Sequence, residues 1–341
     1  MGAATSAALP TIAISHANSP YVTAYSWSTA SGFGSKYTNP SPPPTGSGAG
    51  VAFSPDGKAI AVGHATSPNI SVYSWSLGFG SRYANPATVP TTSGSGVAFS
   101  PNGAALAIGH STTPFVSVYP WSTVSGFGTR YANPATLPGG GGSDLAFSPD
   151  GAALAVPHTG TPFLSVYSWS TASGFGTKYA NPATLPTSGR TVRFSPSGNA
   201  IAVTMNNTPF IHVYPWSTAS GFGTKYANPT ITGATLGGYV TFSPSGDAIA
   251  IGHSGSPWIS VFPWSTGSGF GTKYGNPSFT NAGYVGAITF NPSGTLIIHT
   301  GSNTPFIYAY AWSSASGFGT RYGSVTLPGN GTGVVFSPDM V

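Results

Sequence analysis

One sequence unit of about 47 residues is repeated along the whole of this chain. Its two anchors, a phenylalanine and a tryptophan, each recur at intervals of 46 to 48 residues. The phenylalanines are Phe53, Phe99, Phe147, Phe194, Phe242, Phe290 and Phe336. The tryptophans are Trp27, Trp75, Trp121, Trp169, Trp216, Trp264 and Trp312. Such a period indicates a repeat architecture, in which each unit packs against its neighbours.

Each period predicts four short strands and no helix. In the first full period the strands are residues 51–53, 59–62, 70–75 and 81–83, and Pro55, Asp56 and Gly57 form the first turn. The third strand is rich in β-branched and aromatic residues, which favour a packed, pleated surface. Gly or Pro interrupts almost every helix-length window. Four short strands in a period of this length are typical of a β-propeller blade.

The two ends of the chain complete one blade between them. Residues 334–339 match a first strand and its turn, and residues 11–27 match a second and a third strand. We therefore predict an all-β, seven-bladed propeller that forms one domain, 1–341, and closes through a composite blade of residues 10–45 and 332–341. The other blades are predicted to begin near residues 50, 96, 144, 191, 239 and 287.

Charge is sparse, because Lys and Arg number 10 and Asp and Glu together number 5. Although the net charge is +5, so few cations make a weak field, and a nucleic-acid partner is disfavoured. The chain has no cysteine, which excludes disulfides and thiol catalysis. We expect no signal peptide and no membrane span, since neither pattern occurs.

Two sets of repeated residues mark one face of the predicted disc. The first is a histidine just past the second strand: His16, His64, His110, His158 and His253. A hydrogen-bonding role is favoured over a metal site, because equivalent positions in different blades are too far apart to share an ion. The second is an aromatic residue after proline: Tyr21, Phe115, Phe163, Phe210, Trp258 and Phe306. If these rings are exposed, they form a docking face for a protein or a glycan; if tucked under the turn, they are structural.

A third repeated set consists of cations in the outermost strand. They are Lys36, Arg82, Arg130, Lys178, Lys225, Lys273 and Arg321. Lys, Arg and a following Pro protect an exposed strand edge from pairing with another chain. The alternative is a cationic rim that binds an anionic partner.

Catalytic signals are few. The carboxylates are Asp56, Asp144, Asp150, Asp247 and Asp339, and several of them occupy turn positions. No acid pair or Ser/His/Asp set stands out, so the sequence predicts a protein without catalytic residues, cofactor or metal. The blades differ most at Arg190, Arg193, Tyr239 and Tyr284, which makes blades four to six the place to expect a specific contact.

The phrase Phe147-Ser-Pro-Asp-Gly151, with a later strand that ends in Trp, resembles the WD-repeat propellers across the whole chain. However, Ser follows each Trp where that family has Asp, so the family's buried network is not carried over. The loop sequence from Trp169 to Pro182 resembles loops of propellers found in tailed bacteriophages. This resemblance implies a structural protein on a virion surface that contacts other virion proteins. The alternatives are a glycan-binding propeller and a cytoplasmic interaction scaffold.

Overall fold

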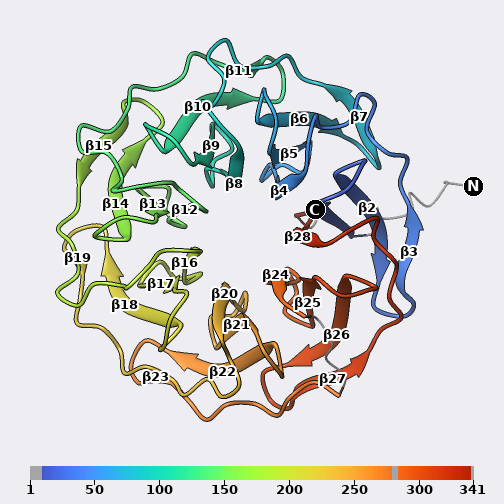
Figure 1. Cartoon of the computed structure of the whole chain (residues 1–341), viewed down its shortest axis with the longest axis vertical. Helices are drawn as coiled ribbons and strands as arrows, with labels where there is room; N and C mark the ends of the chain where they lie inside the picture. Colours follow the sequence, from blue (N-terminus) through green and yellow to red (C-terminus); the bar gives the residue numbers. More distant parts are fainter. Residues whose placement is uncertain (1–9, 279–282, 339–341) are drawn as a thin grey trace, which may run out of the picture.

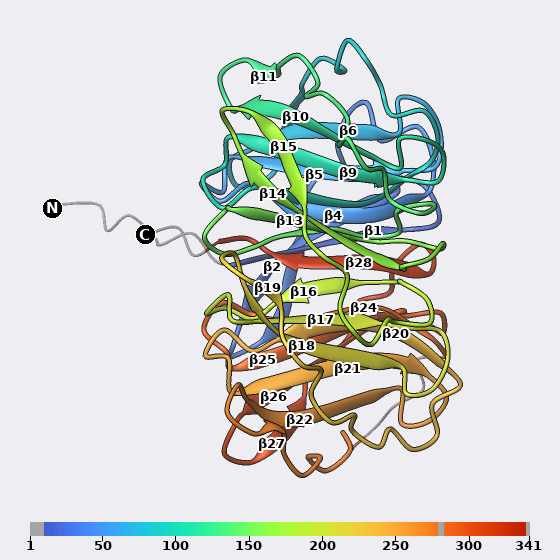
Figure 2. The ribbon, with the colours of Figure 1, turned by 90° about the vertical axis from the view of Figure 1, so that its left-hand side faces the viewer.

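The computed structural model describes residues 10–278 and 283–338, where every regular element is a β-strand. Seven four-stranded antiparallel sheets stand around a ring, with their first strands innermost (Figure 1). This confirms the predicted seven-bladed propeller. Seen edge-on, the strands run across the thickness of the ring (Figure 2). The described residues contain no helix that could cross a membrane. Asp339 and residues 1–9, for which no signal peptide is expected, lie outside them.

Each blade contributes one strand to each of four concentric positions. The innermost strands are β4 (Gly48–Phe53), β8 (Gly94–Phe99), β12 (Ala146–Phe147), β16 (Val192–Phe194), β20 (Leu236–Phe242), β24 (Val285–Phe290) and β28 (Gly331–Phe336). The second strands are β5 (Ala59–His64), β9 (Ala105–His110), β13 (Ala153–Pro157), β17 (Ala200–Thr204), β21 (Ala248–Ser254), β25 (Leu296–Gly301) and β1 (Thr11–His16). The third strands are β6 (Ile70–Trp75), β10 (Val116–Ser122), β14 (Leu164–Ser170), β18 (Ile211–Ser217), β22 (Ile259–Ser265), β26 (Ile307–Ser313) and β2 (Val22–Ser28). The outer strands are β7 (Phe79–Arg82), β11 (Gly126–Phe127), β15 (Gly174–Lys178), β19 (Gly221–Phe222), β23 (Gly269–Phe270), β27 (Gly317–Arg321) and β3 (Gly32–Lys36).

The ring closes through the composite blade, as predicted. Strand β28 pairs with β1, with Ile12 opposite Phe336, and the order of the sheet is β28-β1-β2-β3. The backbone N–H of Ser337 donates to the carbonyl of Thr11 at 2.8 Å, which extends this pairing. Because closure pairs the two ends of the chain in one sheet, the ring has no incomplete blade at either end.

The repeated aromatic residues join strands within a blade and blades to one another. The Trp75 ring lies edge-on against Phe53 and Phe79 of its own blade and against Tyr37 of the neighbouring blade, with ring centroids 5.1 to 5.3 Å apart. Such pairs contribute about 0.5–1.5 kcal/mol each beyond the area they bury. Phe79 pairs with Trp75 in the sheet, so the outer strand begins at Phe79 and not at the predicted residue 81.

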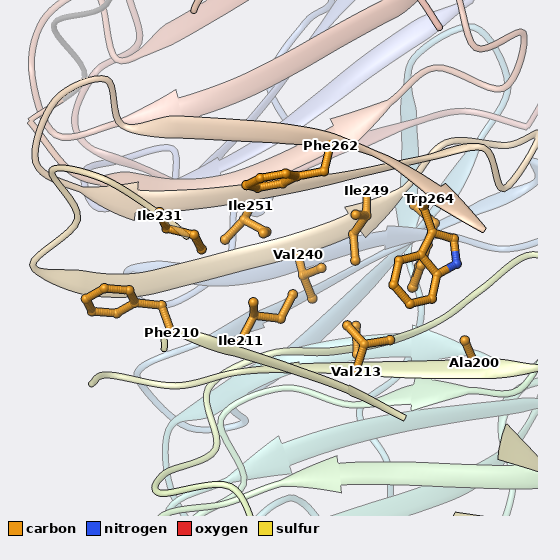
Figure 3. Close-up of a cluster of buried hydrophobic side chains, with 12 residues drawn as sticks. Ala200, Phe210, Ile211, Val213, Ile231, Val240, Ile249, Ile251, Phe262 and Trp264 are labelled. Carbon is orange, nitrogen blue, oxygen red and sulfur yellow. The ribbon is translucent and has the colours of Figure 1, made fainter. Parts of the chain in front are cut away.

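The hydrophobic core lies between adjacent blades. In one cluster, Ile211 and Val213 of β18 face Val240 of the next blade, and Phe262 and Trp264 close the same cluster (Figure 3). Six further clusters of this kind occur among the described residues. Since each blade buries one face against the blade before it and one against the blade after it, both faces of its middle strands are apolar.

Candidate functional site

Two adjoining cavities lie among the innermost strands, in the middle of the ring. The mouth cavity, of about 450 Å³, is lined by Gly48, Gly94 and Gly331, the first residues of β4, β8 and β28. The deep cavity, of about 290 Å³, lies further along the same strands, beside Val51 and Val97. Both cavities are lined by Ala49, Ser95, Arg190, Tyr239 and Thr332. We call these five residues the waist.

The cavity walls come from equivalent positions of blades that are otherwise alike. Three residues before the anchor phenylalanine stand Gly50, Gly96, Asp144, Thr191, Tyr239, Ala287 and Gly333. Four residues before it stand Ala49, Ser95, Ser143, Arg190, Gly238, Gly286 and Thr332. One residue before it stand Ala52, Ala98, Ala146, Arg193, Thr241, Thr289 and Val335. Small residues therefore line one side of the channel, and charged and aromatic residues line the other.

Arg190 is fixed by its backbone and by its side chain. Its N–H donates to the carbonyl of Thr204 at 3.0 Å, and the Ser143 hydroxyl donates to the Arg190 carbonyl at 2.7 Å. Its guanidinium donates through Nη2 to the Tyr284 hydroxyl and through Nη1 to Asn206 Oδ1 at 3.4 Å. The Arg190 Cζ also lies 5.3 Å from the centroid of the Tyr284 ring. The guanidinium is therefore held at the waist by residues from two other elements.

Asp144 and Arg193 form an ion pair across two blades. Arg193 Nη1 lies 2.5 Å from Asp144 Oδ2, which also accepts from the backbone N–H of Val192 at 3.2 Å. Asp144 is buried, whereas Arg193 is partly exposed in the deep cavity. An added Cβ at Gly96 would lie 2.6 Å from Asp144 Oδ1, so this place in β8 must be glycine for the carboxylate to fit. Asp144 Oδ1 accepts no hydrogen bond from the described residues and lies at the cavity wall.

Two tyrosines bring phenol groups to the same place. Burial raises the pKa of the Tyr239 hydroxyl above its usual range; Tyr284 and Asp144 raise it further, and Arg190 and Arg193 oppose the change. Burial also raises the pKa of Tyr284, and Arg190 opposes it. Both phenols are therefore protonated donors at neutral pH. The Tyr239 hydroxyl has no hydrogen-bond partner within residues 10–278 and 283–338, so it is available to a ligand.

The repeated histidines are fully buried and do not line either cavity. His64 Nε2 lies 2.9 Å from the Ser71 hydroxyl of the next strand, and the same pair recurs in three other blades. Burial lowers the pKa of His64 to about 4, which keeps the ring neutral. These contacts support the hydrogen-bonding interpretation. No three His, Asp or Glu side chains of the described residues gather in a way that could hold a metal ion.

The aromatic residues after proline are more enclosed than a docking face requires. Phe210 is buried in the core between two blades, and Trp258 and Phe306 pack against the edges of other clusters. The Trp258 indole N–H donates to the Gly283 carbonyl at 3.0 Å. Tyr21, Phe115 and Phe163 are half-buried. A role for this set in binding a partner stays a prediction.

Four of the repeated cations lie on outer strands, namely Lys36, Arg82, Lys178 and Arg321. The other three, Arg130, Lys225 and Lys273, follow the two-residue strands β11, β19 and β23, which corrects their predicted place in the strand. The outer strands form the rim of the ring (Figure 1). Arg82 donates to Asn85 Oδ1 and Arg130 to Asn133 Oδ1, both at 2.8 Å, and Lys225 donates to Asn228 Oδ1 at 2.7 Å. Each of these three cations is therefore held by an amide of its own loop, and edge protection stays a prediction. Binding of an anionic partner by the rim stays a prediction.

Comparison with known proteins identifies the family. The family model described as "Lactonase, 7-bladed beta-propeller" matches residues 50–236. The chain belongs to this lactonase family. No curated protein sequence matches it.

Solved structures show the same fold in this lactonase-family chain. A Lactobacillus plantarum protein is 15% identical with a TM-score of 0.77, covering 96% of this chain and 99% of its own. A Pseudomonas aeruginosa periplasmic gluconolactonase is 16% identical with a TM-score of 0.72 and the same coverage. A Bacteroides fragilis protein described as a 6-phosphogluconolactonase is 12% identical with a TM-score of 0.73, covering 98% and 99%. At these identities the likeness shows the fold alone.

The family overturns the predicted function. The prediction of a non-enzymatic virion protein of a tailed phage is wrong, because the chain belongs to the lactonase family. The chain is likewise a lactonase-family propeller and not one of the WD-repeat or phage propellers. The prediction failed because it looked for asymmetry among whole blades. The asymmetry that matters here lies at a few positions in or just before the innermost strands, at Asp144, Arg190, Arg193, Tyr239 and Tyr284.

Proposed function

We propose that this lactonase-family chain hydrolyses a small, hydroxyl-rich lactone at the waist of the central channel. One observation carries the proposal: the two cavities meet where the repeat is broken by Arg190 and Tyr239. Both residues present donors to the same space, in a chain whose other blades offer small side chains there. Catalytic sites in propellers of nearly identical blades need such a local departure from symmetry.

The waist supplies groups that can stabilise the transition state. As water attacks a lactone carbonyl, negative charge develops on the carbonyl oxygen, and preorganised donors stabilise that charge. The guanidinium of Arg190 and the hydroxyls of Tyr239 and Tyr284 are such donors. Because Arg190 donates to the Tyr284 oxygen, the Tyr284 O–H itself is left to donate to the substrate.

Asp144 is the carboxylate that lines the deep cavity, and we assign it the role of general base. Its Oδ1 takes a proton from the attacking water as the new C–O bond forms. The ester C–O bond of the lactone ring then breaks, and the departing alkoxide oxygen receives the proton back from Asp144. The product is the open hydroxy acid, and Arg193 holds Asp144 in place through Oδ2 during both steps.

The lining of the mouth cavity limits the substrate. The described residues of this lining are glycines, alanines and polar residues together with Arg190 and the two tyrosines, and none of them has an aliphatic side chain larger than alanine. A long acyl chain would find little apolar surface there. A volume of about 450 Å³ suits a single sugar-sized ring, and one structural neighbour is named a gluconolactonase.

Titration of acid release from glucono-δ-lactone at constant pH tests the proposal. We expect hydrolysis faster than the spontaneous rate, with kcat/KM falling about 10²–10³-fold in Arg190→Met, because a transition-state donor is lost. Arg130→Met is the matched control, since this rim arginine lies on the outer side of the ring and should leave kcat/KM unchanged. If the wild-type protein hydrolyses neither this nor other sugar lactones above the spontaneous rate, the proposal is wrong.

A further inference from the structure

The charges of the two cavities limit what the substrate can carry. Among the described residues that line them, the charged side chains are Arg190, Arg193 and Asp144. A sugar lactone can be neutral, or it can carry a phosphate with close to two negative charges. The structural neighbours include proteins named for both kinds of substrate, so the fold does not decide between them.

Arg193 is not free to bind an anion. Its guanidinium lies 2.5 Å from the buried carboxylate of Asp144, and the same Nη1 donates to the Val192 carbonyl at 2.6 Å. A phosphate that recruited Arg193 would leave the Asp144 charge buried without its partner, which is strongly unfavourable. The pair therefore contributes no net charge to the site.

Arg190 remains as a single cation whose donors are partly used. Its Nη2 and Nη1 already donate to Tyr284 and Asn206. Phosphate sites in proteins combine several cations, a helix N-terminus or a nest of backbone N–H groups. The regular elements of the described residues are all strands, which removes the helix, and none of the repeated Lys and Arg of the rim is among the described residues that line the two cavities.

The opposite wall presents hydrogen-bond acceptors. The hydroxyl of Ser47 donates to the Ala17 carbonyl at 2.7 Å, that of Ser93 to the Ala65 carbonyl at 3.1 Å, and that of Thr332 to the Gly48 carbonyl at 2.7 Å. A hydroxyl has one hydrogen to donate, so the Ser47 and Ser93 oxygens offer only lone pairs to a ligand. The Thr332 oxygen also lies 3.0 Å from the Ser15 hydroxyl, so while it donates to Gly48 it has one lone pair left for a ligand. Sugar hydroxyls can donate to them, whereas a phosphate dianion, which only accepts, is repelled.

We propose that this site accepts an unphosphorylated polyhydroxy lactone and discriminates against its phosphorylated counterpart. The inference rests on the proposed lactone hydrolysis and concerns only the charge of the substrate. It follows from one partly engaged cation on one wall and acceptor oxygens on the other.

Two measurements test the inference. We expect kcat/KM for glucono-δ-lactone to exceed that for 6-phosphoglucono-δ-lactone by at least about tenfold, because the phosphate lacks the partners that a buried charge needs. Equal values or a preference for the phosphorylated lactone would overturn the inference and leave lactone hydrolysis intact. Calorimetry with the non-hydrolysable glucono-δ-lactams, with and without the 6-phosphate, shows whether the site prefers a neutral or a phosphorylated ligand. This measurement does not depend on turnover. Tighter binding of the neutral lactam supports the inference, whereas tighter binding of the phosphate, or binding of neither, contradicts it.

Adding a second cation to the small-residue wall provides a gain-of-function test. Ser95 lines both cavities, so Ser95→Arg should raise the ratio of phosphorylated to unphosphorylated kcat/KM by at least about tenfold. Ser95→Gln, similar in length but neutral, is the matched control and should not change the ratio. If Ser95→Arg fails to fold, Ala49→Lys with Ala49→Gln places the same charge at the waist. An unchanged ratio in the folded cationic variant would contradict the inference.

Discussion

The inner strands on the two sides of the channel differ in length and in the side chains beside them. On one side, β28, β4 and β8 are each six residues long, and their backbones approach closely. An added Cβ at Gly50, for example, would lie 2.7 Å from the Ser95 carbonyl oxygen. On the other side, β12 has only two residues and β16 three, and the side chains of Asp144, Arg190 and Arg193 stand beside these shortened strands. Close packing of backbones on one side of the channel is partly replaced on the other by polar side chains suited to chemistry.

The largest effect we predict is a loss of folding stability at acid pH. It arises from the buried neutral histidines, which occur in blades on both sides of the channel. Burial lowers the pKa to about 4 for His16, His64, His158, His212, His253 and His299. The unfolded chain binds protons below pH 6.5, whereas the folded chain does so only near pH 4. Stability is therefore present above pH 6.5 and is lost as the pH falls toward 4. Each such histidine costs about 2 kcal/mol at pH 5, and the six together remove on the order of 10 kcal/mol.

Urea denaturation at pH 7.5 and pH 5.0 measures this loss. His64→Met is the sharpest variant, because Met205 occupies the equivalent buried position in the fourth blade. It should reduce the difference in unfolding free energy between the two pH values by about 2 kcal/mol. Exposed, titrating histidines would give a stability that does not change over this range, contrary to the burial described here.

The fold could be predicted from the sequence because its causes are repeated. Every blade repeats the phenylalanine, the turn and the tryptophan, so the same packing contacts recur around the ring. The contacts of Trp75 with Phe53 and Tyr37 are an example. The site could be predicted only in part. Arg190, Arg193, Tyr239 and Tyr284 are visible in the sequence as departures from the repeat, whereas no catalytic motif in the sequence distinguishes Asp144 from the other four carboxylates. Its pairing with Arg193 depends on how the side chains of two adjacent blades meet beside the channel, which spacing along the chain does not reveal.

The second test of the comparison replaces Asp144 and Arg193 on the polar side of the channel with the small residues found on the other side. Arg193→Ala alone should lower the unfolding free energy by about 2–3 kcal/mol, since the buried Asp144 carboxylate loses its partner. This loss of stability is smaller than for a fully buried ion pair because Arg193 is partly exposed to solvent. The double variant Asp144→Gly with Arg193→Ala restores the residues of the β4 and β8 blades, Gly and Ala. It should recover most of this stability, yet it should hydrolyse no lactone.

A double-mutant cycle in urea, with Asp144→Gly as the other single variant, gives the coupling energy of the pair. Recovery in the double variant together with loss of hydrolysis would show that the pair serves the site and not the ring. If the double variant were less stable than Arg193→Ala, the pair would be needed for closure, and the contrast between the two sides would be wrong.

The smallest effect we predict tests whether one side must stay small for the other to function. In Gly96→Ala the new Cβ would meet Asp144 at 2.6 Å from Oδ1 and 2.7 Å from Cα, so the carboxylate and its backbone must shift. We expect a loss of about 1–2 kcal/mol in unfolding free energy from this overpacking, measured by urea denaturation. Gly275→Ala is the matched control, because its added Cβ meets no atom within 4 Å. We also expect kcat for lactone hydrolysis to fall in Gly96→Ala and to stay unchanged in Gly275→Ala, because only the first variant moves the proposed base. Wild-type stability and kcat in Gly96→Ala would show that Asp144 does not depend on the glycine opposite it.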